Sequence, residues 1–277
     1  MAAVLALCCA AAYGVGDFFG GLAARRVAAT TVLLWSHVLG LGLLLAATTI
    51  VGGAADGPDL LYGAVGGLSG AAGVGLLYKG LSVGPMSVVA PITALLSAAV
   101  PVLWGVAQGE RPALNVVVGM GLALVAIVLV SAEGSGTFRP SDVRGLLYAL
   151  GAGLGFGLFF VALSYTDGGS GVWPLVAARA ASVTVVGSLA LVGRVPRRLP
   201  EGQARSLTAG AGTLDAAANV LYLLAIREGL LSVVSVLAAL YPAGTVLLAR
   251  VVLREQFAPL QRAGLALALP AAALMAL

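Results

Sequence analysis

The chain has 277 residues, of which 60% are hydrophobic and only 9% are charged, and its mean hydropathy is +1.06. A soluble domain carries about 25% charged residues, so this composition cannot cover a water-facing surface and lipid must surround most of the chain. The net charge of +4 does not indicate nucleic acid, because the basic residues lie in short loops and form no patch. We therefore predict a multi-pass protein of the cell (plasma or inner) membrane, with the lipid bilayer as its surroundings.

Ten apolar segments follow one another along the chain, each close to the length that crosses a bilayer. They cover residues 2–23, 31–51, 61–81, 86–108, 114–132, 145–165, 173–193, 207–227, 231–252 and 259–276. The segments are continuously apolar rather than alternating, which favours helices over a transmembrane barrel. The sequence thus predicts an all-α membrane protein with ten transmembrane helices.

A polar stretch containing Glu133, Arg139 and Asp142 divides the ten segments into two sets of five. We predict a first five-helix repeat at residues 1–132, a connecting loop at 133–144 and a second five-helix repeat at 145–277. Because five is odd, the second repeat enters the membrane from the opposite side, and the repeats are inverted.

One pattern of small and polar residues occurs in both halves at a constant offset of 145 residues, from 84 to 229 for example. The first set is Gly84, Ser87, Glu110 and Gly119, and the second is Gly229, Ser232, Glu255 and Gly264. Paired repeats around a central site are typical of transporters. The two glutamates lie at segment ends beside Arg111 and Arg254, so we interpret them as helix caps or members of loop ion pairs.

Lys and Arg are distributed unevenly over the loops. Twelve of them lie in the first, third, fifth, seventh and ninth loops, whereas the even-numbered loops contain only Arg111 and Arg227. Basic loops stay in the cytoplasm. The charge distribution therefore places the odd-numbered loops in the cytoplasm and both termini outside.

Three stretches resemble EamA-type transporters of the drug/metabolite transporter superfamily. Gly109-Glu110-Arg111-Pro112 looks like the Gly-Glu-Arg signature that closes the fourth helix of that family. Residues 239–255, with Pro242 thirteen positions before the glutamate, resemble the matching part of the second repeat. Gly14 and Phe18, with Tyr13 in place of a tryptophan, are similar to the opening motif of the family.

This resemblance implies a ten-helix bundle of two inverted five-helix repeats that exports or exchanges small metabolites by alternating access. It also implies that both termini lie in the cytoplasm, which is the reverse of what the charge distribution predicts. The first repeat departs from the pattern, with Ser97 where the second repeat has Pro242. Because of this departure, we do not predict symmetric roles for the two fourth helices.

Three ionisable residues lie within the apolar segments, where each costs about 2.5–3.5 kcal/mol to insert. Asp17 follows two glycines in the first segment, and we predict that it carries a proton or binds a cation. The alternatives are a hydrogen bond between helices or an ion pair with Arg179. Arg179 and Asp215 lie at similar depths in consecutive segments and could form a salt bridge or bind substrate.

Further polar residues could line a cavity or couple transport to protons. His37 is the only histidine, and histidine titrates near physiological pH, although a histidine satisfied by a hydrogen bond is the alternative. Asn219 lies one turn after Asp215 and forms a polar stripe with it and Tyr222. A polar stripe cannot face lipid, so it must face protein or a water-filled cavity.

Aromatic residues near these polar positions are predicted to form the cavity walls: Tyr13, Tyr78, Trp104, Tyr222 and Tyr241. Pro91, Pro101 and Pro242 are predicted to lie inside helices and bend them, either for gating or as fixed packing kinks.

The motifs of common enzymes are missing from the sequence, including a phosphate loop, zinc-ligand spacing and a nucleophile elbow. We therefore predict no catalytic residues, no metal site and no cofactor. The predicted function is secondary active transport of a small metabolite, such as an amino acid or a related compound, coupled to an ion or substrate gradient. The alternatives are a non-transporting membrane subunit, a flippase for a lipid-linked substrate, or a membrane enzyme acting on lipid. The protein is expected to be a monomer or a homodimer.

Overall fold

The computed structural model describes residues 1–83, 86–131, 142–193, 198–253 and 258–276, and over these residues the regular structure is entirely helical. In the first half, the helices are α1 (Ala2–Ala24), α2 (Ala29–Val51), α3 (Gly57–Val83), α4 (Met86–Ala107) and α5 (Leu114–Ser131). In the second half they are α6 (Asp142–Ser164), the short 3-10 helix η1 (Gly168–Ser170), α7 (Trp173–Leu191), α8 (Gly202–Glu228), α9 (Leu231–Ala238), α10 (Tyr241–Leu253) and α11 (Pro259–Ala276). The prediction of an all-α protein is confirmed.

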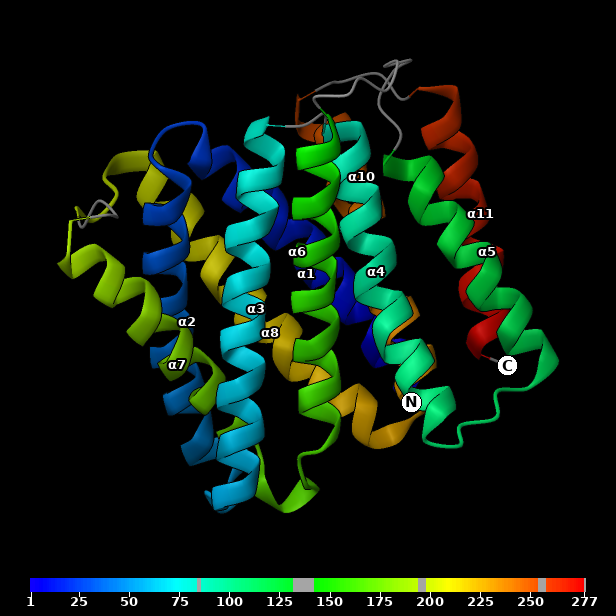
Figure 1. Cartoon of the computed structure of the whole chain (residues 1–277), viewed down its shortest axis with the longest axis horizontal. Helices are drawn as coiled ribbons and strands as arrows, with labels where there is room; N and C mark the ends of the chain where they lie inside the picture. The colour runs from blue at the N-terminus through cyan, green and yellow to red at the C-terminus, as the bar shows by residue number, and fades with distance from the viewer. Residues whose placement is uncertain (84–85, 132–141, 194–197, 254–257, 277) are drawn as a thin grey trace.

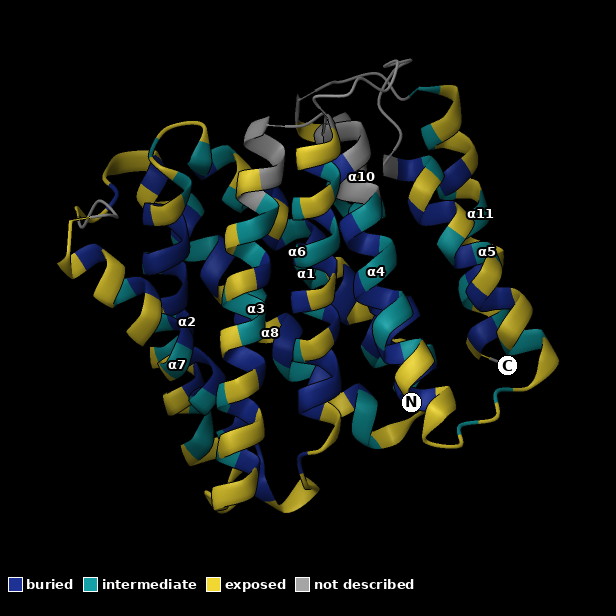
Figure 2. Cartoon of the chain, viewed as in Figure 1, coloured by how far each residue is buried: buried dark blue, intermediate teal, exposed yellow. Residues whose placement is uncertain are grey.

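The helices form one bundle (Figure 1). Among the described residues, seven helices are long and apolar enough to cross a membrane, and three shorter apolar helices span Ile92–Ala107, Leu114–Val130 and Leu231–Thr245. Exposed positions occur all along the described parts of α3, α5 and α6 rather than only at their ends (Figure 2). Many of these exposed residues are large and apolar, such as Leu61 of α3, Leu114 of α5 and Leu147 of α6. Lipid, not water, is the solvent that such faces require.

The most extensive helix contacts join the two halves of the chain. α3 packs along α6 and α7, α1 packs along α8, α4 packs along α6, and α5 packs along α11. Figure 1 shows α3, α6 and α4 side by side, and α5 beside α11. Contacts between successive helices of one half are much less extensive. The two halves therefore interleave, and neither is a separate structural domain.

Glycines make these contacts possible because they allow helix backbones to approach closely. A Cβ atom added at Gly67 of α3 would overlap the backbone of Ala178 in α7, and one at Gly155 of α6 would lie 2.7 Å from the carbonyl oxygen of Ser69. The repeated glycines have matching roles. A Cβ at Gly119 of α5 would lie 3.0 Å from the Ala271 carbonyl oxygen in α11, and one at Gly264 of α11 would lie 2.6 Å from the Val130 nitrogen in α5.

The ninth predicted segment, 231–252, is divided into two helices. α9 ends at Ala238, residues 239 and 240 form a turn, and α10 begins at Tyr241. Pro242 is thus the second residue of α10, so it lies in the first turn of a helix rather than in the middle of one. Proline lacks the N–H that would bond to the Ala238 carbonyl, but it is well tolerated in the first turn of a helix. The equivalent helix of the first half, α4, runs unbroken past Ser97, so the two fourth helices differ as the sequence suggested.

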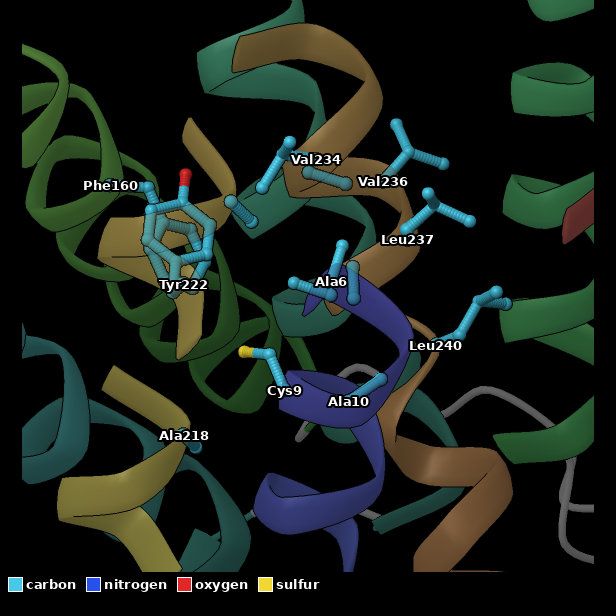
Figure 3. Close-up of a cluster of buried hydrophobic side chains, with 14 of the residues drawn as sticks. Ala6, Cys9, Ala10, Phe160, Ala218, Tyr222, Val234, Val236, Leu237 and Leu240 are labelled. Atoms are coloured by element: carbon cyan, nitrogen blue, oxygen red, sulfur yellow. The ribbon is translucent and has the colours of Figure 1, made fainter. Parts of the chain in front are cut away.

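Small residues of α1 pack against α9 in the core. Figure 3 shows Ala6 beside the branched side chains of Val234 and Leu237, and Cys9 and Ala10 belong to the same buried cluster. All five residues are at most 6% exposed. The small side chains bring the break between α9 and α10 close to α1, where the polar residues of α1 follow one turn later.

Candidate functional site

A cavity of about 440 Å³ lies inside the bundle, between helices of both halves. Its charged and polar lining comprises Tyr13, Asp17, Ser36, His37, Ser97, Arg179, Ser182, Asp215, Asn219, Tyr241, Thr245 and Gln261. All five polar residues singled out from the sequence, Asp17, His37, Arg179, Asp215 and Asn219, are among them. Most of the remaining lining is apolar.

The cavity reaches one end of the bundle. Its lining includes Ala24 in the last turn of α1, Val32 in the first turn of α2, Leu77 near the end of α3 and Gln261 in the first turn of α11. These helix ends lie at the end of the bundle that carries the α1–α2 connection, opposite the two chain termini (Figure 1). We call this the cavity end of the bundle, and the end with the termini the closed end.

Arg179 of α7 and Asp215 of α8 form an ion pair through Nη2 and Oδ2. The Arg179 side chain is 11% exposed and that of Asp215 is 35% exposed, so the pair sits in the cavity wall with its carboxylate partly open. Gly40 of α2 lies beside the guanidinium, and a Cβ there would be in van der Waals contact with Nε at 3.6 Å. The predicted salt bridge is therefore present, and it also lines the cavity.

Asn219 connects this ion pair to α1. Its Nδ2 donates to the carbonyl oxygen of Asp215 at 2.6 Å, and its Oδ1 accepts from the Tyr13 hydroxyl at 3.1 Å. Tyr13 in turn makes an edge-to-face contact with Tyr241, with ring centroids 6.4 Å apart. The backbone of α10 comes this close because a Cβ at Gly14 would lie 2.7 Å from the Tyr241 carbonyl oxygen. The signature glycine of the first helix thus positions the cavity aromatics.

Asp17 lies one turn beyond Tyr13 on α1 and is exposed to the cavity. Its carboxylate forms no hydrogen bond and no ion pair with the residues that the structure describes. The alternative in which Asp17 pairs with Arg179 does not apply, because Arg179 pairs with Asp215.

His37 of α2 is buried and its Nδ1 lies 2.6 Å from the Ser182 hydroxyl of α7. One of the two groups donates to the other, according to the histidine tautomer. The structure therefore shows the hydrogen-bonded arrangement that was the alternative to a proton-coupling histidine. Ser182 was not identified from the sequence, although its position one turn after Arg179 would have suggested the same face.

The predicted aromatic walls are only partly in place. Tyr13 and Tyr241 line the cavity, and the side chain of Tyr78 lies outside the described part. Tyr222 does not line it: its ring stacks on Phe160 with centroids 4.2 Å apart (Figure 3), and its hydroxyl lies 2.8 Å from the Ser235 oxygen. Trp104 is also elsewhere, at the outer surface, where its Nε1 donates to the Tyr165 hydroxyl at 2.9 Å.

Phenylalanines of α6 form the aromatic wall instead, namely Phe156, Phe159 and Phe160. Sequence reasoning missed them because phenylalanine in an apolar segment has no polar group to indicate a cavity. Of the three prolines, Pro242 lines the cavity, Pro101 is buried in α4, and the side chain of Pro91 is outside the described part.

Polar contacts cross the closed end of the bundle. Arg227, at the end of α8, donates through Nη2 to the carbonyl oxygens of Asp167 and Gly171, both at 2.9 Å. The Asp167 nitrogen donates to Asp59 Oδ2 of α3 at 3.0 Å, and the Ala54 nitrogen donates to the Gly169 carbonyl oxygen, also at 3.0 Å. These contacts join the α2–α3 and α6–α7 connections. These contacts are hard to predict from sequence, since loop carbonyls are the main acceptors.

Glu110 provides a further contact at the closed end, from the end of the first repeat to the second. Its Oε1 accepts from the Leu231 nitrogen at 2.7 Å and its Oε2 from the Ser232 nitrogen at 3.1 Å, so it caps the N-terminus of α9. Gly105 leaves space for the carboxylate, because a Cβ there would overlap it. The interpretation of Glu110 as a helix cap is confirmed. Glu255, its counterpart, lies outside the described residues.

Replacing Glu110 with glutamine is expected to lower the free energy of unfolding by about 1 kcal/mol, because the amide offers one acceptor where α9 presents two N–H groups and a positive helix end. Glu201→Gln is the matched control, since Glu201 precedes α8 without forming a side-chain cap. Thermal unfolding of the detergent-solubilised proteins measures both changes. Equal stability of the two variants would contradict the capping role.

Comparisons with known proteins agree with this architecture. The model of the EamA-like transporter family matches residues 1–132 and 143–277. A solved chain described as "Crystal structure of protein" has a TM-score of 0.81 to this one, with 19% sequence identity over 99% of this chain and 95% of that chain. At that identity the likeness shows a shared fold. None of the curated proteins compared with the sequence matches it. Because the family model covers nearly the whole length in two parts, the chain belongs to the EamA-like transporter family.

Proposed function

We propose that the protein is a secondary active transporter that exports or exchanges a small metabolite, such as an amino acid or a related compound, by alternating access. The observation that supports this best is the asymmetry of the bundle. A cavity with charged residues reaches one end, and hydrogen bonds join the helix connections at the other. Ten membrane crossings fit the chain if α9 and α10 together make one crossing.

In alternating access, an inverted-repeat transporter opens one end of the bundle while it closes the other, and the binding site between them stays in place. In this proposal the contacts of Arg227, Asp167 and Asp59 break when the closed end opens, while the cavity end closes. Each of these hydrogen bonds involves a charged group and contributes about 1.5–3 kcal/mol, which is small enough to be exchanged for others during a transport cycle. The sequence contains no nucleotide site, so an ion or substrate gradient supplies the energy.

The cavity residues have distinct proposed roles. The Arg179–Asp215 pair and Asn219 hold α7, α8 and α1 together around the cavity, and Tyr13 and Tyr241 contact the substrate. His37 links α2 to α7 through Ser182. The turn between α9 and α10, beside Pro242, is the proposed bending point of the second half.

Solute exchange by the purified protein in liposomes tests the proposal. Vesicles are loaded with unlabelled amino acids, amines, organic acids or nucleosides in turn, and uptake of the same labelled compound is measured. Saturable uptake of at least one class, absent from empty liposomes, is expected. Absence of exchange for every class, by protein that unfolds cooperatively, would contradict transport and favour the non-transporting subunit.

The direction of transport depends on which end faces the cytoplasm. The charge distribution places the cavity end inside the cell, whereas the family resemblance places it outside. A single-cysteine variant at Arg26, in the exposed α1–α2 connection, distinguishes the two. Labelling by a membrane-impermeant maleimide in intact cells places the cavity end outside, and labelling only after lysis places it inside. Cys8 and Cys9 are replaced by alanine beforehand.

A further inference from the structure

The cavity has an unbalanced charge. Three charged side chains occur among its described lining residues: Asp17, Arg179 and Asp215. Arg179 and Asp215 neutralise each other in their ion pair. Asp17 has no hydrogen-bond or ion-pair partner among the described residues and is exposed to the cavity. A carboxylate at this depth is costly unless a cation or water compensates it, so an unpartnered one indicates a binding function.

There is free space beside Asp17. On the same helix, a Cβ added at Gly21 would meet no atom within 4 Å, and one at Gly20 would meet only the Cβ of Ala211, at 3.8 Å. Both glycines line the cavity. The absence of side chains at these positions leaves room for a ligand group next to the carboxylate.

Aromatic rings lie on the side of Asp17 nearer the closed end. Tyr13 is one turn before Asp17 on the same face of α1, and its edge-to-face partner Tyr241 comes from α10. The Tyr13 hydroxyl is engaged by Asn219, so the tyrosine presents its ring rather than a free donor. A carboxylate together with electron-rich ring faces is the arrangement that attracts organic ammonium groups.

The rest of the lining is suited to an apolar body. Phe156 and Phe159 of α6, Leu33 of α2 and Val74 of α3 contribute hydrophobic surface to the same cavity. The only guanidinium in the described lining is already paired with Asp215, so a substrate carboxylate has no free cationic partner there. The cavity therefore favours a cation over a zwitterion or an anion of similar shape.

We propose that the transported substrate is a small organic cation, an amine with an apolar body, and that Asp17 is its counter-ion. This inference rests on the proposed transport function and names its substrate class. Asp17 binds the ammonium group, Tyr13 and Tyr241 contact it with their rings, and the α6 phenylalanines contact the apolar body.

Three probes of nearly equal size and different charge test this assignment: 2-phenylethylammonium, 2-phenylethanol and 3-phenylpropionate. Calorimetric titration of the purified protein gives their relative affinities. The ammonium probe is expected to bind at least about ten times more tightly than either of the other two probes. A roughly tenfold difference in affinity corresponds to one good charge contact. In Asp17→Asn this preference is expected to disappear. Asp56→Asn, in the exposed α2–α3 connection, is the matched control and should retain it.

Several results would overturn the assignment: equal binding of the three probes, preference for the carboxylate, unchanged selectivity in Asp17→Asn, or no binding of the amine at millimolar concentration. Displacement of the amine by millimolar sodium or potassium would also overturn it, in favour of an inorganic-ion site. If Asp17→Asn does not fold, Tyr241→Leu is the second test. It should weaken binding of the ammonium probe by several-fold while changing 2-phenylethanol less.

Failure of this inference and failure of the proposed function give different results. Exchange of neutral or anionic solutes in liposomes, without binding of the amine, overturns the substrate class and leaves transport intact. Charge-selective amine binding that is lost in Asp17→Asn, without any exchange, supports the assigned site and contradicts transport.

Discussion

Arg179→Gln is expected to destabilise the folded protein by about 3 kcal/mol, the lower end of the range for breaking a buried ion pair. The substitution leaves Asp215 in the bundle without its partner. The lower end applies because the Asp215 side chain is 35% exposed, toward the cavity, where water can partly compensate its charge. Thermal or denaturant-induced unfolding in detergent measures the loss.

Arg198→Gln is the control for Arg179→Gln, since Arg198 is exposed and outside the cavity. It should change stability by less than about 0.5 kcal/mol. The double variant Arg179→Met, Asp215→Leu removes both charges and should be more stable than Arg179→Gln. If the double variant were less stable, the unpaired charge could not be the cause of the loss.

Gly67→Ala is expected to destabilise the protein by about 3 kcal/mol or more, because overpacking at a rigid contact forces backbones apart. The new methyl group would overlap the backbone of Ala178, which cannot move aside as a flexible side chain can. Gly67 and Ala178 also line the cavity, so separation of α3 from α7 would weaken ligand binding as well. The yield of folded protein and its unfolding temperature measure the effect.

The control on the same helix is Gly75→Ala, where the added methyl group meets no atom within 4 Å. That change should be neutral or stabilising by up to about 1 kcal/mol, since alanine favours a helix more than glycine does. Similar losses for the two variants would show that helix propensity or membrane insertion, rather than close packing of α3 on α7, governs the result.

The helical fold and the polar residues of the cavity could be predicted because the bilayer imposes strong constraints. Continuous apolar segments must be helices, and charges such as Asp17 and Arg179 must avoid lipid. Aromatic residues were harder to place. Tyr222 and Tyr241 look alike in sequence, but Ser235 and Phe160 hold Tyr222 in the core. Which of two tyrosines reaches a cavity depends on helix rotation, and that is set by tertiary packing.

The repeated pattern of glycines and glutamates was recognised in the sequence, but its meaning required the structure. Glu110 contacts the start of α9. Gly119 of α5 packs against α11, and Gly264 of α11 packs against α5. Each of these residues acts across the two halves. A single sequence shows that a pattern repeats, but not which copy contacts which. The contacts of Arg227 were missed for a related reason, because their acceptors are backbone carbonyls of loops distant in sequence.

The interleaving of the two halves has a consequence for how the protein is made. During synthesis α1, α3 and α4 enter the bilayer before α6, α7 and α8, which are their main neighbours, exist. The glycine faces of α3 must therefore remain open to lipid until the second half has been inserted, and the first half cannot complete its packing alone. A ribosome that stalls after α5 would leave a chain with unsatisfied helix faces, a natural target for membrane quality-control proteases.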